Sequence, residues 1–74
     1  MHLGKVILIY KTNIGSSIHR DELRTLFEPQ RGIVEWSVDL EDSDKVLRVV
    51  CEGTPRFDVA AEVRLKGFQC EELE

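Results

Sequence analysis

The residues whose side chains could bind a metal or act on a substrate are few, and their spacing does not bring them into one motif. Cys51 and Cys70 lie far apart in the sequence and form no CxxC pair. The histidines, His2 and His19, each lack a second ligand at a spacing typical of zinc sites. The acids between positions 39 and 44 lack the glycine and the distal glutamate of a calcium loop. We therefore predict no metal centre among these residues and interpret the cysteines as small buried hydrophobic side chains.

Sequence signatures of catalysis are also missing. The chain contains no nucleophile elbow, no glycine loop of the phosphate-binding type and no evident pair of catalytic carboxylates. We expect a protein that is not an enzyme and that needs no cofactor.

Length and composition are those of one small folded domain over residues 1–74, with 42% hydrophobic and 32% charged residues. No apolar run approaches the roughly 20 residues that cross a bilayer, and the N-terminus lacks the hydrophobic region of a secretory signal. We expect a cytoplasmic chain without a membrane segment. The net charge of -4 disfavours nucleic acid as a partner, because phosphate backbones attract basic surfaces. So small a core favours association with a second copy.

The elements that must position any site begin with a strand and a helix. Residues 6–10 form a short, continuous apolar and β-branched run, typical of a central strand that is buried on both faces. Ser16 and Ser17 are suited to cap a helix that ends before Pro29. The predicted apolar stripe of this helix contains Ile18, Leu23, Leu26 and Phe27.

The remainder of the chain predicts a hairpin, a second helix and a final strand. Alternation with polar residues predicts a half-buried strand through Val34, Trp36, Val38 and Leu40. A polar turn over 41–44 and a returning strand over 46–51 complete the hairpin. The second helix is expected to start at Thr54 and Pro55 and to end at Lys66 and Gly67, with a stripe of Phe57, Ala60, Ala61 and Leu65. Residues 68–73 predict an edge strand.

This order of elements predicts an α+β fold, the ferredoxin-like βαββαβ sandwich, in which a four-stranded antiparallel sheet carries two helices on one face. In that topology the strands of Cys51 and Cys70 are separated by the first strand. We therefore expect no disulfide between the two cysteines.

The loop over residues 11–17, together with the hairpin over 36–40 and the ending Lys66-Gly67-Phe68, resembles the heavy-metal-associated domain of the small copper-chaperone type. In that family the loop carries Met-x-Cys-x-x-Cys, whose two thiolates bind Cu(I). Thr12 falls at the methionine, Ile14 at the first cysteine and Ser17 at the second, with Asn13 between them. Lys66 and Phe68 match the second loop, which packs beneath the metal site. The resemblance thus implies the fold, with a degenerate loop that has lost both copper ligands.

Residues 9–14 are also similar to the first ribonucleoprotein motif of the RNA-recognition fold, which has the same order of elements. The expected third strand, over 45–51, contains none of the aromatic residues that stack bases. We therefore expect no binding of nucleic acid. The two alignments differ in Tyr10, which the chaperone-like alignment buries beneath the helices and the RNA-binding alignment places on the open face.

The sheet face away from the helices is expected to meet solvent or a partner. We predict that Ile7, Ile9, Val46 and Val50 contribute to that face and that homodimers form through it. The leading hypothesis is a non-catalytic module that binds a protein or itself, the identity of the partner being open. One alternative is a copper-handling protein with unconventional ligands, and a second is a small-molecule sensor like the regulatory ACT domains.

Overall fold

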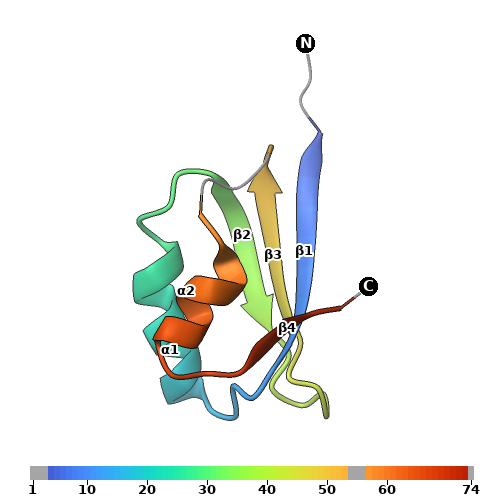
Figure 1. The fold of residues 1–74 in the computed structure, drawn as a ribbon, viewed down its shortest axis with the longest axis vertical. Helices are drawn as coiled ribbons and strands as arrows, with labels where there is room; N and C mark the ends of the chain where they lie inside the picture. The colour runs from blue at the N-terminus through green and yellow to red at the C-terminus, as the bar shows by residue number, and fades with distance from the viewer. Residues whose placement is uncertain (1–3, 54–56, 74) are drawn as a thin grey trace.

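The computed structural model describes residues 4–53 and 57–73, and within these ranges the chain forms one sheet with helices on one of its faces (Figure 1). The elements in chain order are β1 (Lys5–Thr12), α1 (Ser17–Phe27), β2 (Ile33–Val38), β3 (Leu47–Glu52), α2 (Val59–Leu65) and β4 (Cys70–Glu72). The four strands pair antiparallel in the order β2-β3-β1-β4. The structure is therefore an α+β fold in which β1 is central and the short β4 lies at an edge, as predicted.

β1 is not buried on both faces, and this corrects one expectation. The side chains of Ile7 and Ile9 are 51% and 37% exposed. Tyr10, on the opposite face, is buried in the core. The apolar run belongs to a strand in the middle of a sheet whose second face is uncovered. Sequence periodicity alone does not distinguish such a strand from one that is buried on both faces.

α1 begins where the two serines indicated. Ser16 is the N-cap, and its side chain accepts a hydrogen bond from the backbone N–H of His19 at 3.2 Å. Leu23 and Phe27 face the core, and the ring of Phe27 lies 5.2 Å from that of Trp36 on β2. Ile18 is 71% exposed, so its predicted place in the buried stripe is wrong.

α2 begins later than predicted. Asp58 is its N-cap, with the carboxylate accepting from the Ala61 N–H, whereas the proposed start at residues 54 and 55 lies outside the described residues. The buried face consists of Val59, Ala60 and Val63, while Leu65 is 80% exposed and does not belong to it.

The end of α2 at Lys66 and Gly67 is as expected. The N–H groups of Gly67 and Phe68 donate to the carbonyls of Arg64 and Val63, and Gly67 has a φ of 100°. This is a Schellman termination, which favours glycine because a Cβ disfavours positive φ.

A β-bulge between Ile33 and Glu35 changes which side chains of β2 are buried. Ile33 packs against the core, and Val34, which the alternation placed inside, is 46% exposed. β2 ends at Val38, so Leu40 packs against the core from the connection to β3 and not from a strand.

The core fills the space between the helices and one sheet face. Its fully buried side chains include Phe27, Ile14, Leu23, Leu47, Val49, Val59, Val63, Cys51 and Cys70. In the described part of the chain, no helix combines the length and the apolar character that a membrane crossing requires.

Candidate functional site

The loop that follows β1 is the candidate site indicated by the sequence, and its first residue of interest, Thr12, is used to hold the loop. Thr12 is 7% exposed. Its hydroxyl donates to the carbonyl of Lys45 and accepts from the N–H of Ile14 at 3.2 Å. Lys45 has a φ of 45°, and its amino group donates to the carbonyl of Leu40 at 2.6 Å. Thr12 thus fastens the loop to the β2–β3 connection.

Ile14, at the position of the first copper ligand in the chaperone-like alignment, is a core residue. It is completely buried and belongs to the same cluster as Leu23 and Phe27. Ser17, at the position of the second ligand, is the first residue of α1 and is exposed. The loop therefore turns one ligand position into the core and uses the neighbouring Ser16 to start the helix.

Asn13 joins this loop to the second one. Its side-chain oxygen accepts from the N–H of Gln69 at 2.8 Å. Phe68 packs against the core and lies with its ring 5.2 Å from that of His19, whereas Lys66 is exposed at the helix end. The two loops named by the resemblance are thus adjacent, held by an amide hydrogen bond and an edge-on aromatic contact.

Groups that could ligate a metal do not gather in the described residues. These residues contain no cluster of three or more histidine, cysteine, aspartate or glutamate side chains suited to an ion. His2 lies outside the described residues. Cys51 and Cys70 are free, buried thiols on β3 and β4, and β1 lies between these two strands as predicted.

Burial makes the titratable groups of the core resistant to ionisation. Desolvation raises the pKa of Cys70 from 9.0 to about 11, although the Arg64 guanidinium partly opposes this shift. Desolvation also raises the pKa of Cys51. The pKa of Tyr10 rises to about 12 for the same reason, with smaller contributions from Cys70 and Glu72. At neutral pH both thiols are protonated, which is the unreactive form.

Tyr10 lies on the helix side of the sheet and not on its open face. It is 5% exposed and packs in the core beneath the helices. The five aromatic residues of the chain all belong to the core or pack against it: Tyr10, Phe27, Trp36, Phe57 and Phe68. No base-stacking platform is therefore formed on the open face by these side chains.

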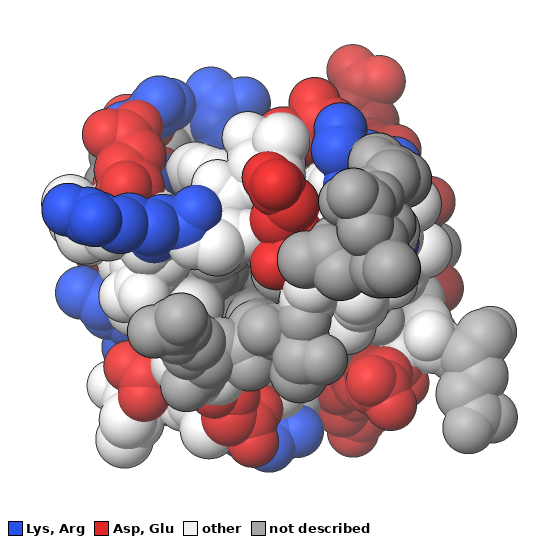
Figure 2. Space-filling model, turned by 90° about the horizontal axis from the view of Figure 1, so that it is seen from above, with Lys and Arg blue, Asp and Glu red and all other residues white. Residues whose placement is uncertain are grey.

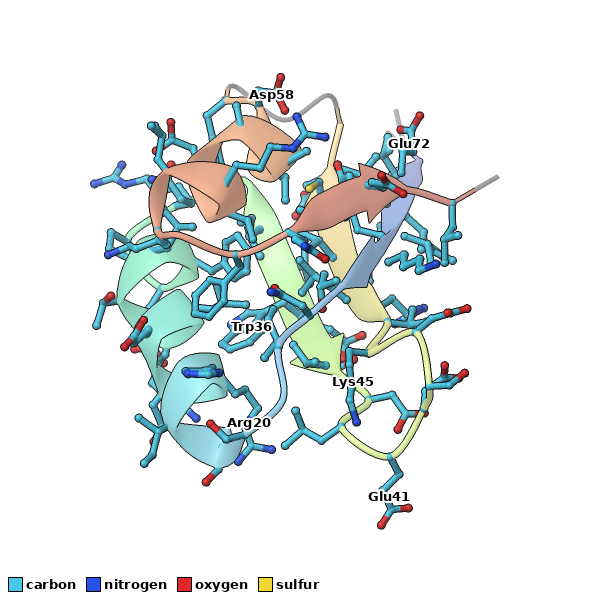
Figure 3. The ribbon with its side chains drawn as sticks, turned by 60° about the horizontal axis from the view of Figure 1, so that its bottom comes forward. Arg20, Trp36, Glu41, Lys45, Asp58 and Glu72 are labelled. Carbon is cyan, nitrogen blue, oxygen red and sulfur yellow. The ribbon has the colours of Figure 1, made fainter. Side chains whose placement is uncertain are left out.

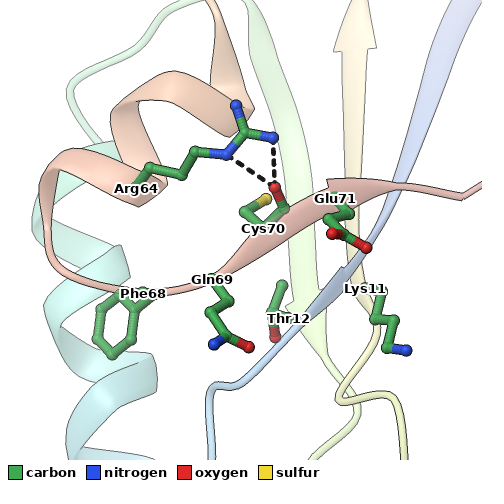
Figure 4. Close-up of a pocket in the computed structure, with 7 residues that line it drawn as sticks. All are labelled: Lys11, Thr12, Arg64, Phe68, Gln69, Cys70 and Glu71. Atoms are coloured by element: carbon green, nitrogen blue, oxygen red, sulfur yellow. Dashed lines mark hydrogen bonds between the residues drawn. The ribbon is translucent and has the colours of Figure 1, made fainter.

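A surface pocket of about 510 Å³ lies where β4 meets the end of β1, next to the candidate loop (Figure 4). Its wall includes Arg64, whose Nε and a terminal nitrogen both donate to the carbonyl of Cys70, at 2.9 and 2.6 Å. Lys11 and Glu71 line the same pocket and are opposite each other across the β1–β4 pair. The sequence did not indicate Arg64, because nothing in its local pattern predicts a bond to a carbonyl six residues away.

The open face carries the other predicted contact residues. Ile7 pairs with Val50 across β1 and β3, so both side chains lie on this face. Val50 is only 4% exposed, and Val46 is partly buried just before β3, so neither offers the exposed surface that was predicted. The exposed apolar side chains are those of Ile7, Ile9 and Leu73, the last of which donates its N–H to the Ile9 carbonyl at 2.8 Å. We call these three residues the open-face strip.

Comparison with protein-family models gives no match to this chain, and comparison with curated proteins gives none either. Function therefore has to follow from the contacts of the loop and from the open face of the sheet.

Proposed function

We propose that this chain is a non-catalytic protein-interaction module of the ferredoxin-like class, related to heavy-metal-associated domains, whose contact surface is the open face of its sheet. The observation that carries the proposal is the open-face strip, in which Ile7 and Ile9 of β1 are 51% and 37% exposed and Leu73, directly after β4, is 37% exposed. Exposed apolar side chains that adjoin one another favour contact with another protein.

The ferredoxin-like class and the relation to heavy-metal-associated domains are each supported by one feature. The strand order β2-β3-β1-β4 combines with the chain order strand, helix, strand, strand, helix, strand. Burial of Tyr10 favours the chaperone-like alignment over the RNA-binding one.

The contacts of the loop support a role that does not depend on a metal. Thr12 and Asn13 use their side chains to bind neighbouring backbone groups, and Ile14 fills the core. A thiolate at position 14 would have to leave that core to reach an ion, because a buried thiol resists ionisation and a metal ligand must be deprotonated. The loop is thus better suited to supporting the fold than to holding copper.

Charged residues of both signs surround the open-face strip. Lys5 of β1 is opposite Glu52 of β3 in the strand register. A guanidinium nitrogen of Arg48 lies 3.7 Å from a carboxylate oxygen of Glu35. An apolar centre within a charged rim is the usual anatomy of a protein interface. Basic and acidic side chains likewise both appear on the end of the molecule seen in Figure 2, and neither sign covers it. This mixture favours a protein partner over a polyanion.

Photo-crosslinking tests the proposal. We would place p-benzoylphenylalanine at Ile7 on the open face and, as the control, at Leu65, which is exposed on the opposite side of the molecule. Irradiation in source cells should link the chain to one predominant protein, or to a second copy, from position 7 and not from position 65. Equal products from both positions, or none from position 7, would contradict the proposal.

Metal analysis tests the main alternative. The purified chain, reduced and incubated with Cu(I) or Zn(II), should retain less than one ion per chain after exchange into metal-free buffer. Tight binding of one ion per chain would overturn the non-metal role, whatever the crosslinking result.

A further inference from the structure

We propose that the outer edge of β2 and the groove between β2 and α1 bind an extended segment of a partner protein, which adds a strand to the sheet and places an acidic side chain near Arg20 and Arg24. This inference rests on the proposed function as an interaction module, but it concerns a different surface from the open-face strip. It also specifies the chemistry of the segment that is bound.

The hydrogen-bond pattern of β2 shows which backbone groups are available. The N–H of Asp39 donates to the Val46 carbonyl at 2.9 Å, so the backbone groups at this position point toward β3. Because the N–H and C=O groups of successive residues alternate between the two sides of a strand, the N–H and C=O groups of Ser37 and Glu35 also point toward β3. Trp36 and Val38 therefore direct their N–H and C=O groups away from the sheet. Among residues 4–53 and 57–73, β2 pairs only with β3 and lies at the edge of the sheet, so no neighbouring strand meets these outward groups.

The opposite edge of the sheet is protected in a way that β2 is not. β4 has only three residues, and the guanidinium of Arg64 occupies the carbonyl of Cys70 (Figure 4). Short strands and covered carbonyls discourage strand addition. β2 has six residues, and its bulge lies between Ile33 and Glu35, leaving a regular edge from Glu35 to Val38.

A groove accompanies this free edge. One hollow of about 370 Å³ lies between Arg20 and Arg24 of α1 and residues 36–38 of β2. A second, of about 360 Å³, lies between Phe27 and Glu28 of α1 and residues 33–36 of β2. Trp36 lines both, and Figure 3 shows its ring on the helix side of the sheet. The groove therefore follows β2 for most of its length, as strand addition requires.

The charges of the groove define its occupant. The hollow at the Val38 end is lined by two arginines. The acids at the Ile33 end are already paired, Glu28 with Arg24 and Glu35 with Arg48, so the charge of the occupant is set by the arginine hollow. Arg24 already pairs with Asp21 and Glu28, whereas the Nε of Arg20 is buried without a hydrogen-bond partner among the described residues. A carboxylate brought into this hollow would lie beside two guanidinium groups, which favour a negatively charged occupant.

The spacing of the occupant follows from strand geometry. Alternate side chains of an added strand face the helix side, so two positions two residues apart would meet the arginine hollow and Trp36. The segment would then read acid-x-apolar along one face, in either chain direction. A second copy paired through its own β2 fits less well, because the helix-side residues of that strand, including Trp36 and Val38, are not acidic.

A selection from a displayed library of random nine-residue peptides, with the full chain as bait, tests this inference. We expect enrichment of an acid two positions from a large apolar residue. Chemical shifts in the labelled chain should change most at the amides of Trp36 and Val38 when an enriched peptide is added. On a bait with Arg24→Glu, the enrichment of these peptides should be at least ten-fold lower than on the original chain. The control bait Arg31→Glu makes the same charge change outside the groove and should enrich them as the original chain does.

Arg20→Met provides a second variant in which loss of folding is not expected, because it removes a buried donor that has no partner and keeps the aliphatic stem. It should preserve the melting temperature and abolish the preference for an acid.

Enrichment that is equal for all baits, or no enrichment, would overturn the inference, as would shifts confined to Ile7 and Ile9. Self-association lost on Arg24→Glu would overturn it in favour of a second copy at β2. None of these results would alter crosslinking from position 7, so the proposed function can stand or fail separately.

Discussion

Thr12 illustrates at the scale of one residue how the loop after β1 is held. Its hydroxyl bridges the Lys45 carbonyl and the Ile14 N–H; the bond to Ile14 is buried and the bond to Lys45 is partly buried. The sequence identified Thr12 only as a position that a metal-binding family fills with methionine. Its partner lies 33 residues away and has an uncommon left-handed backbone, which no local pattern indicates.

We predict that Thr12→Val lowers the free energy of unfolding by about 1–3 kcal/mol, because it leaves buried backbone groups without partners. Urea denaturation would measure this change. Thr25→Val is the matched control, since Thr25 donates to the Glu22 carbonyl on the exposed surface of α1. An equal loss in the two variants would show that Thr12 has no special role in holding the loop.

The buried thiol of Cys70 makes a prediction about pH. Folding raises its pKa from 9.0 to about 11, so the folded chain holds its proton more tightly than the unfolded chain. This contribution to stability is fully present below pH 9 and is lost as the pH rises toward 11.

Urea denaturation at several pH values between 9 and 11 should therefore show that the free energy of unfolding falls more steeply with pH for the original chain than for Cys70→Ala. Parallel curves would indicate that Cys70 ionises equally readily in the folded and unfolded chains.

At the scale of the elements, strand and helix identities followed from the sequence better than their faces did. The alternation through Val34 and Trp36 correctly predicted a strand, but a bulge shifted its inward register at Ile33. Bulges depend on pairing with β3, so a single strand's sequence does not reveal them. For α2, the four-residue spacing of Val59 and Val63 was a visible signal of the buried face, and Leu65 was mistaken for part of it.

The end of α2 gives a prediction at this scale. Gly67→Ala should destabilise the chain by about 1–2 kcal/mol, because a Cβ is unfavourable at the φ of 100°. Gly32→Ala is the control, since its added Cβ meets nothing within 4 Å and its φ is not positive. Thermal unfolding of both variants would measure the difference, and a larger effect at Gly32 would be inconsistent with the Schellman termination.

At the scale of the whole molecule, the helices and the core lie on one side of the sheet and the open-face strip lies on the other. The sequence predicted this layering and placed Ile7 and Ile9 outside the core. It could not predict that Val50 would be covered on the same face, because burial there depends on neighbours from β1 and β2. The groove beside β2 was also missed, since it is built by Arg20, Arg24 and Trp36 from separate elements.

The five isoleucines of the chain provide probes for the most direct test of the open face as a contact surface. Ile7 and Ile9 lie on that face, Ile14 is in the core, and Ile18 is 71% exposed on α1. We would label the isoleucine methyl groups and record their NMR signals before and after addition of an extract from source cells. We expect selective loss of the Ile7 and Ile9 signals while that of Ile18 persists. Equal loss at Ile18, or no loss at Ile7 and Ile9, would contradict this expectation.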